Sequence, residues 1–143
     1  MGAPIDIIQN WTEIRADMII DVRSPAEFLE DHIPSAINMP VLNNEERAEV
    51  GTIYKQKNAF QARRYGGALV AKNISEHILT RLGNMPVEFR PLFYCWRGGQ
   101  RSASFARICS DIGWRTYVLK GGYKSYRRNV LIAVSYTHLR AHE

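Results

Sequence analysis

Short runs of apolar residues alternate along this chain with segments that carry helical patterns. Several runs are apolar at nearly every position, which is typical of strands buried on both faces of a parallel sheet. The predicted strands cover residues 5–8, 18–22, 36–38, 92–95 and 116–119. Because strands alternate with helices, the pattern predicts an α/β domain with a parallel sheet and right-handed crossovers.

Helix starts and ends are marked by polar and glycine residues. Three segments place Asn or Ser three residues before Glu, as in a capping box, at residues 10–13, 24–27 and 73–76. Gly83 and Gly113 each follow an apolar helical stripe and are predicted to end those helices.

The long interval between the third and fourth predicted strands, residues 43–90, is expected to be a helical insertion. It has room for two or three helices. Asn43 and Glu46 predict the start of the first one, and residues 74–83 carry the apolar face of the last. The sequence Tyr-Gly-Gly at 65–67 is predicted to bend or interrupt the segment.

Size and composition indicate one domain in a reducing compartment. The chain has 143 residues, 45% hydrophobic and 23% charged, and only two cysteines. Its apolar runs are too short to span a membrane, and the first ten residues lack the basic segment of a signal peptide, so we expect a cytoplasmic protein. Residues 134–143 fit neither a helical nor a strand pattern and look non-native, so the predicted domain covers residues 1–133.

The net charge of +5 is unevenly distributed. Residues 1–42 hold seven acidic and two basic side chains, whereas residues 91–133 hold one acidic and eight basic side chains. This asymmetry predicts an anionic partner for the C-terminal half, such as phosphate, a selenium or sulfur oxyanion, or RNA. A solvated basic face is the alternative.

The clearest chemistry lies where the fourth predicted strand ends at Cys95. Ligands of open α/β sheets bind beyond the carboxyl ends of the strands. A glycine-containing loop, a helix N-terminus and nearby arginines would favour the thiolate, the form that a cysteine nucleophile requires. The predicted oxyanion and substrate contacts are Trp96, Arg97, Gly98, Gly99, Gln100 and Arg101. A buried structural cysteine beside a tight turn is the alternative.

Cys109 lies on an apolar helical stripe and is expected to be structural. Its spacing from Cys95 does not fit a metal site, so no metal is predicted.

Three segments, residues 21–40, 92–102 and 118–126, resemble the successive signatures of a rhodanese domain. The resemblance implies a five-stranded parallel sheet with helices on both faces and a cysteine that carries sulfur or selenium as a persulfide-type adduct. Asp21 and Arg23 are candidates for an ion pair that supports the site. Gly121 and Gly122 follow the fifth strand, where glycine allows close approach of the backbone to the active-site loop; an ordinary strand-to-helix turn is the alternative.

A narrower resemblance, carried by residues 43–56 with Gly-Gly-Gln-Arg-Ser and Gly-Gly-Tyr-Lys, is to the N-terminal half of the tRNA 2-selenouridine synthase family. It implies that Cys95 is the nucleophile that helps replace the sulfur of 2-thiouridine in a tRNA anticodon with selenium, with selenophosphate as donor and through a geranylated intermediate. It implies no tightly bound cofactor. The P-loop domain of that family has no counterpart in these 143 residues, so geranyl diphosphate is expected only with that domain.

Basic residues interleaved with aromatic ones within the insertion are candidate tRNA contacts, although a solvated helix would have the same pattern. These candidates are Lys55, Lys57, Arg63 and Arg64. Three other functions stay open: a generic thiosulfate sulfurtransferase, a phosphatase, since residues 95–102 satisfy Cys-x5-Arg-Ser, and a tRNA-binding module without catalysis.

Overall fold

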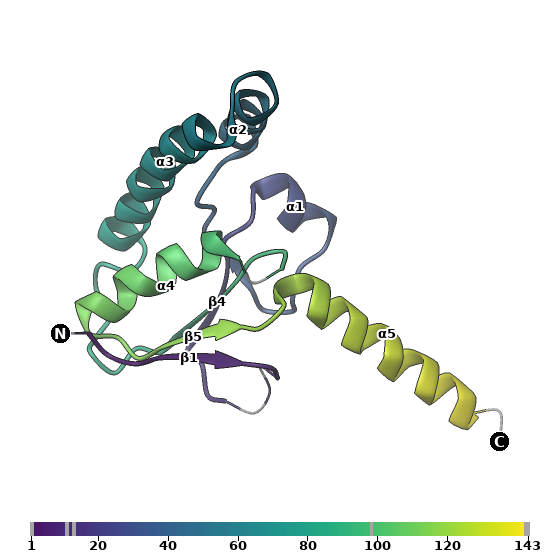
Figure 1. Ribbon diagram of the computed structural model, residues 1–143. Coiled ribbons are helices and arrows are strands. Elements are labelled where there is room, and N and C mark those ends of the chain that lie inside the picture. The colour runs from purple at the N-terminus through teal and green to yellow at the C-terminus, as the bar shows by residue number, and fades with distance from the viewer. Residues whose placement is uncertain (1, 11, 13, 98, 142–143) are drawn as a thin grey trace.

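A computed structural model describes residues 2–10, 12, 14–97 and 99–141 of the chain, with side chains described as far as residue 131. Five parallel strands form one sheet in the order β1-β5-β4-β2-β3, and helices lie on both of its faces (Figure 1). The elements are β1 (Ile5–Ile8), β2 (Met18–Asp21), α1 (Pro25–Glu30), β3 (Ile37–Asn38), α2 (Asn44–Gln56), α3 (Ala59–Thr80), β4 (Pro91–Tyr94), α4 (Gln100–Ile112), β5 (Thr116–Leu119) and α5 (Gly122–Ala141). The predicted α/β fold with a parallel sheet is confirmed.

Alternating side chains of β4 fill the two halves of the core. Phe93 packs on Phe105 of α4 beneath one face, with 4.6 Å between the ring centroids. Tyr94 packs with Tyr123, at the start of α5, on the other face. Every residue of β4 and β5 is buried, which explains why both strands read as nearly continuous apolar runs. Residues that directly follow β4 are therefore held on a well-packed strand.

The insertion is a pair of packed helices, α2 and α3, that extends away from the sheet (Figure 1). The predicted interruption at residues 65–67 is wrong, because α3 continues through them. Gly66 instead lets the two helices approach closely: a Cβ atom at this position would lie 3.3 Å from Cγ1 of Val50 on α2.

The predicted helix start at Asn73 is also wrong, since this residue lies inside α3. Its side-chain amide donates hydrogen bonds to the Val41 carbonyl and to Oε1 of Glu46, both at 2.9 Å. The true N-cap is Asn58, whose side chain accepts a hydrogen bond from the backbone N–H of Gln61 at 2.8 Å. An Asn with a polar partner in a tertiary contact thus has the same sequence pattern as a cap.

The predicted caps at residues 24–27 and 43–46 are confirmed. Glu27 accepts from the backbone N–H of Ser24 at 3.1 Å, and Glu46 accepts from that of Asn43 at 2.9 Å. The cap predicted at residues 10–13 involves residues 11 and 13, which lie outside the described part of the chain.

Helix α5 includes residues 134–141, so the expectation that this segment fits no regular element is wrong. The helix that begins at Gly122 continues because neither Gly nor Pro interrupts residues 123–141. None of the described helices combines the length and apolar character needed to cross a bilayer.

Candidate active site at the end of strand β4

The thiol of Cys95 lies between the end of β4 and the N-terminus of α4. The backbone N–H of Gly99, the N-cap of that helix, donates a hydrogen bond to Sγ at 3.0 Å. The hydroxyl of Ser102 lies 3.2 Å from the same sulfur. Both groups, together with the helix N-terminus, would stabilise negative charge on Sγ. Cys95 itself is 3% exposed, so it sits deeper than a side chain at an open crevice.

Ser102 is a site residue that the sequence analysis did not assign. It is fully buried in the first turn of α4, and its hydroxyl also lies 3.2 Å from the Gly99 carbonyl, so its single proton can be donated either to that carbonyl or to a Cys95 thiolate. The signal was present in the sequence, because a Ser three residues after the N-cap reaches the same turn as the loop amides.

The predicted contact residues in the loop after Cys95 differ from one another in their exposure to solvent. Trp96 is half-buried against Tyr123, with 5.7 Å between ring centroids, whereas Arg97 and Gln100 are exposed. Gly98 lies outside the described residues. Arg97 is therefore available to solvent, and Trp96 acts mainly as packing between the loop and α5.

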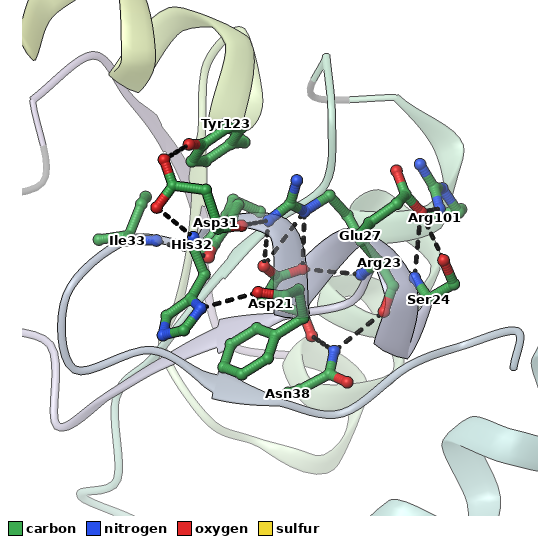
Figure 2. A network of polar contacts seen from close by, with 12 residues as sticks. Asp21, Arg23, Ser24, Glu27, Asp31, His32, Ile33, Asn38, Arg101 and Tyr123 are labelled. Atoms are coloured by element: carbon green, nitrogen blue, oxygen red, sulfur yellow. Dashed lines mark hydrogen bonds and ion pairs between the residues drawn. The ribbon is translucent and has the colours of Figure 1, made fainter. Parts of the chain in front are cut away.

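Arg101 donates to Oε1 of Glu27 in an ion pair at 3.0 Å (Figure 2). Arg47 of the insertion approaches the same oxygen at 3.5 Å. Burial alone would raise the pKa of Glu27, but the hydrogen bond and charge of Arg101, with Ser24 and Arg47, outweigh it and lower that pKa. The prediction that Arg101 serves the thiol loop did not include this partner, which neutralises much of its charge.

The predicted partners Asp21 and Arg23 form a buried ion pair at the end of β2, whose last residue is Asp21. Their side chains are 0% and 3% exposed, and Nη2 of Arg23 lies 2.8 Å from Oδ2 of Asp21 (Figure 2). The Asn38 side chain donates to the carbonyls of both residues, at 3.0 and 2.9 Å. The pair thus supports the ends of β2 and β3 and does not face solvent.

Tyr123 connects this ion pair to the loop that follows Cys95. Cζ of Arg23 lies 4.3 Å from the centroid of the Tyr123 ring, over the ring face, and the Tyr123 hydroxyl donates to the carboxylate of Asp31 (Figure 2). Burial, followed by the hydrogen bond and charge of Asp31, raises the pKa of Tyr123 to about 12. Its backbone N–H donates to the Cys95 carbonyl at 2.7 Å.

Gly121 and Gly122 bring the start of α5 against this loop. Their φ angles are 77° and 59°, in the left-handed region that favours glycine. A Cβ atom on Gly121 would lie 2.6 Å from Cβ of Ser125. The turn positions Lys124 to donate its backbone N–H to the Trp96 carbonyl at 2.9 Å, so the backbone of this turn does contact the active-site loop.

The candidate tRNA contacts of the insertion are all exposed. Lys55 and Lys57 lie at the end of α2, and Arg63 and Arg64 lie on the first turns of α3. Arg63 lines a mainly apolar cavity of about 600 Å³ between the insertion and α4, and Arg101 lines it from the other side.

Cys109 lies near the C-terminus of α4, away from the helix N-terminus and the glycine loop that Cys95 contacts. It is fully buried in the core, and burial raises the pKa of its thiol to about 12. A thiol in that environment stays protonated and inaccessible.

Comparison with known proteins identifies relatives over most of the chain. A family model described as a rhodanese-like domain matches residues 6–129. A tRNA 2-selenouridine synthase of Nitrosomonas europaea is 37% identical over 117 residues, which are 81% of this chain and 30% of that protein. The enzymes of the same name from Bdellovibrio bacteriovorus and Proteus mirabilis are 40% and 41% identical, over 80% and 77% of this chain and 30% and 31% of theirs. The chain thus spans about a third of the length of these relatives.

Solved structures show the same fold. The N-terminal domain of a protein from Clostridium difficile 630, assigned as ATP/GTP binding, has a TM-score of 0.76 and 36% identity, and covers 90% of this chain and 99% of that one. Bacillus anthracis CoADR-RHD has a TM-score of 0.51 and 23% identity over 85% of this chain and 16% of that chain, which supports the fold alone. With its five-stranded parallel sheet and a cysteine after β4, this chain belongs to the rhodanese-like domain family.

Proposed function

We propose that this chain is the rhodanese domain of a selenium or sulfur transferase that modifies tRNA, as in tRNA 2-selenouridine synthase, and that Cys95 is its nucleophile. The observation that carries the proposal is the pair of contacts to Sγ from the Gly99 amide and the Ser102 hydroxyl at the start of α4. The relatives that share this domain bear the enzyme's name and support the choice of substrate.

The first step would load the cysteine. The Cys95 thiolate attacks the selenium of selenophosphate, an S–Se bond forms, the P–Se bond breaks, and the phosphorus group leaves as phosphite with its electron pair. With thiosulfate, the same attack forms an S–S bond and releases sulfite. The Gly99 amide and the α4 N-terminus would stabilise the anionic adduct, and no bound metal or cofactor enters this step.

The outer selenium of this adduct would then attack C2 of the S-geranylated 2-thiouridine in a tRNA anticodon, so that a C–Se bond forms, the C–S bond breaks and geranylthiol leaves. A second thiol would then cleave the remaining Se–S bond, which reduces the selenium and leaves a disulfide between that thiol and Cys95. We assign geranyl diphosphate chemistry to a P-loop domain outside these 143 residues, in keeping with the longer relatives. The reaction belongs in the cytoplasm, where tRNA is present and free thiols such as Cys95 and Cys109 stay reduced.

A phosphatase is the main competing function, because Arg101 completes a Cys-x5-Arg pattern. The ion pair between Arg101 and Glu27 argues against it, since a phosphatase needs this guanidinium for the phosphate.

Mass spectrometry of the intact chain after incubation with selenophosphate or thiosulfate tests the proposal. We expect the mass to rise by one selenium or sulfur atom in the wild type and in Cys109→Ser, and to stay unchanged in Cys95→Ser. An adduct with thiosulfate only would indicate a generic sulfurtransferase. Hydrolysis of phosphomonoesters without any adduct would indicate a phosphatase. If neither reaction occurs, a tRNA-binding module without catalysis is the remaining function.

A further inference from the structure

A basic cavity lies beside the nucleophile loop, on the side where α5 begins. It has a volume of about 760 Å³, and four of its eight lining residues are cationic and none is acidic. The lining residues are Gln9, Arg97, Lys120, Gly121, Lys124, Ser125, Arg128 and Asn129. We call this feature the basic cavity.

Main-chain hydrogen bonds join the basic cavity to the nucleophile. Lys124 donates its backbone N–H to the carbonyl of Trp96, and Tyr123 donates to that of Cys95. Arg97 follows Cys95 by two residues and lines the cavity directly. A ligand bound there would therefore contact Arg97 of the loop that follows Cys95.

The cations of the basic cavity are free of acidic partners. Arg97, Lys120, Lys124 and Arg128 are exposed, and within the described residues none of them has a carboxylate within 4.0 Å. Arg101 and Arg115, in contrast, are paired with Glu27 and Asp6. Uncompensated charges gathered on one surface attract anions over roughly the Debye length of 8 Å at physiological salt.

The size of the basic cavity favours a polyanion over a single phosphate ion. A phosphate group takes the space of a few water molecules of about 30 Å³ each, far less than the cavity provides. The cations come from three segments, the nucleophile loop, the β5–α5 turn and α5, and therefore suit several successive phosphates. The side chains of Gln9, Ser125 and Asn129 add neutral hydrogen-bonding groups between them.

We propose that the basic cavity binds the phosphodiester backbone of the RNA substrate and so brings a nucleotide to Cys95. The inference rests on the proposed function, because it assumes that the acceptor of the transferred atom is RNA. It agrees with the expectation of an anionic partner for the C-terminal half and differs from the expectation that placed the tRNA contacts on the insertion, at Lys55, Lys57, Arg63 and Arg64.

The test measures the affinity of the 143-residue chain for tRNA that carries 2-thiouridine, across a range of KCl concentrations. The variant combines Lys120→Gln, Lys124→Gln and Arg128→Gln and leaves Arg97 intact. Because each lost phosphate contact lowers the slope of log K against log salt by about 0.7 to 0.9, we expect the slope to fall by about 2 and the affinity to fall at least about tenfold at roughly 0.1 M salt.

The matched control combines Lys72→Gln, Arg90→Gln and Arg107→Gln, which removes the same charge from exposed cations outside the basic cavity. We expect it to change the affinity less than about twofold. Equal losses in both variants would mean that only the overall charge matters and would overturn the proposal. A thermal unfolding measurement on each variant checks that the substitutions leave the fold intact.

Two further experiments distinguish RNA phosphates from free inorganic phosphate as the ligand, and the basic cavity from the insertion as the RNA-binding surface. If inorganic phosphate displaces tRNA far better than chloride at the same ionic strength, the cavity is a site for a single ion and the proposal fails. Loss of binding in a Lys55→Gln, Lys57→Gln and Arg64→Gln variant, with none in the basic-cavity variant, would place the RNA on the insertion instead.

The outcomes separate this inference from the proposed function. If Cys95 forms the adduct but the basic-cavity variant binds tRNA as tightly as the wild type, the proposed function stands and the RNA-binding surface proposed here is wrong. If tRNA binds through the basic cavity but Cys95 forms no adduct, the RNA-binding surface stands and the proposed transfer reaction is wrong.

Discussion

At the scale of single residues, burial determines how much an ion pair contributes to the free energy of unfolding. Asp21 and Arg23 are nearly inaccessible to water, whereas the side chains of Asp6 and Arg115 are 40% and 49% exposed in a pair of similar length. A charge left alone in the interior costs far more than one left alone at the surface. The two pairs therefore allow a direct comparison within one protein.

Asp21→Asn is expected to lower the free energy of unfolding by about 3 to 5 kcal/mol, because Arg23 would keep a buried charge without its partner. Asp6→Asn should cost less than about 1 kcal/mol. Urea denaturation measures both. If Asp21→Asn does not fold, the double variant Asp21→Leu with Arg23→Met should recover folding, since it removes both charges. Equal effects of the two single substitutions would contradict the importance of burial.

The contact between Ser102 and the Cys95 sulfur makes a second prediction at this scale. Ser102→Ala should slow alkylation of Cys95 by iodoacetamide about tenfold, the effect of losing one hydrogen bond to a charged group. Ser104→Ala is the control, because its hydroxyl donates to the Gln100 carbonyl one turn along the same helix. Peptide mapping should find Cys109 unmodified in every variant, and a rate unchanged by Ser102→Ala would show that this hydroxyl does not act on the sulfur.

At the scale of elements, Glu27 joins three helices. It lies in α1, it pairs with Arg101 of α4, and it lies within reach of Arg47 of α2. The insertion and the helix that follows Cys95 thus share one carboxylate. Its lowered pKa makes the strength of this junction depend on pH.

Glu27→Gln should lower the free energy of unfolding by about 2 kcal/mol at pH 7. Because the pKa of Glu27 in the folded state lies below its unfolded value of about 4.3, the carboxylate stabilises the fold above that value. This contribution is lost as the pH falls through the folded pKa. The difference between wild type and variant should therefore shrink as the pH is lowered from 7 to about 3.

Glu30→Gln provides the control in the same helix, because Glu30 is exposed and has no ion pair within 4.0 Å among the described residues. Its unfolding curve should follow that of the wild type at every pH. A Glu27→Gln deficit that stayed constant on acidification would show that charge plays no part.

At the scale of the whole molecule, the sequence predicted the sheet but not the shape of the insertion. Buried parallel strands have a local signature, and β1, β2, β4 and β5 were placed to within about one residue. The continuity of α3 could not be predicted, because Gly66 and Asn73 look like helix breakers or starts unless Val50 and Val41 are known to face them.

The candidate site was predictable to a similar degree. Cys95 and its glycine loop follow from the end of a buried strand, and Asp21 and Arg23 are close in sequence. The pairing of Arg101 with Glu27 joins residues 74 positions apart, and the basic cavity joins Gln9 to Arg128. Contacts of that kind depend on the strand order, which periodicity alone does not determine.

The carbonyls of Cys95 and Trp96 are held by main-chain N–H groups of Tyr123 and Lys124, not by their side chains. Amide donors stay in place when a side chain is exchanged, provided that the glycine turn before them is kept. Substitution at Lys124 is therefore expected to change the charge of the basic cavity while the Cys95 sulfur keeps its position, which makes this turn a suitable place for engineering.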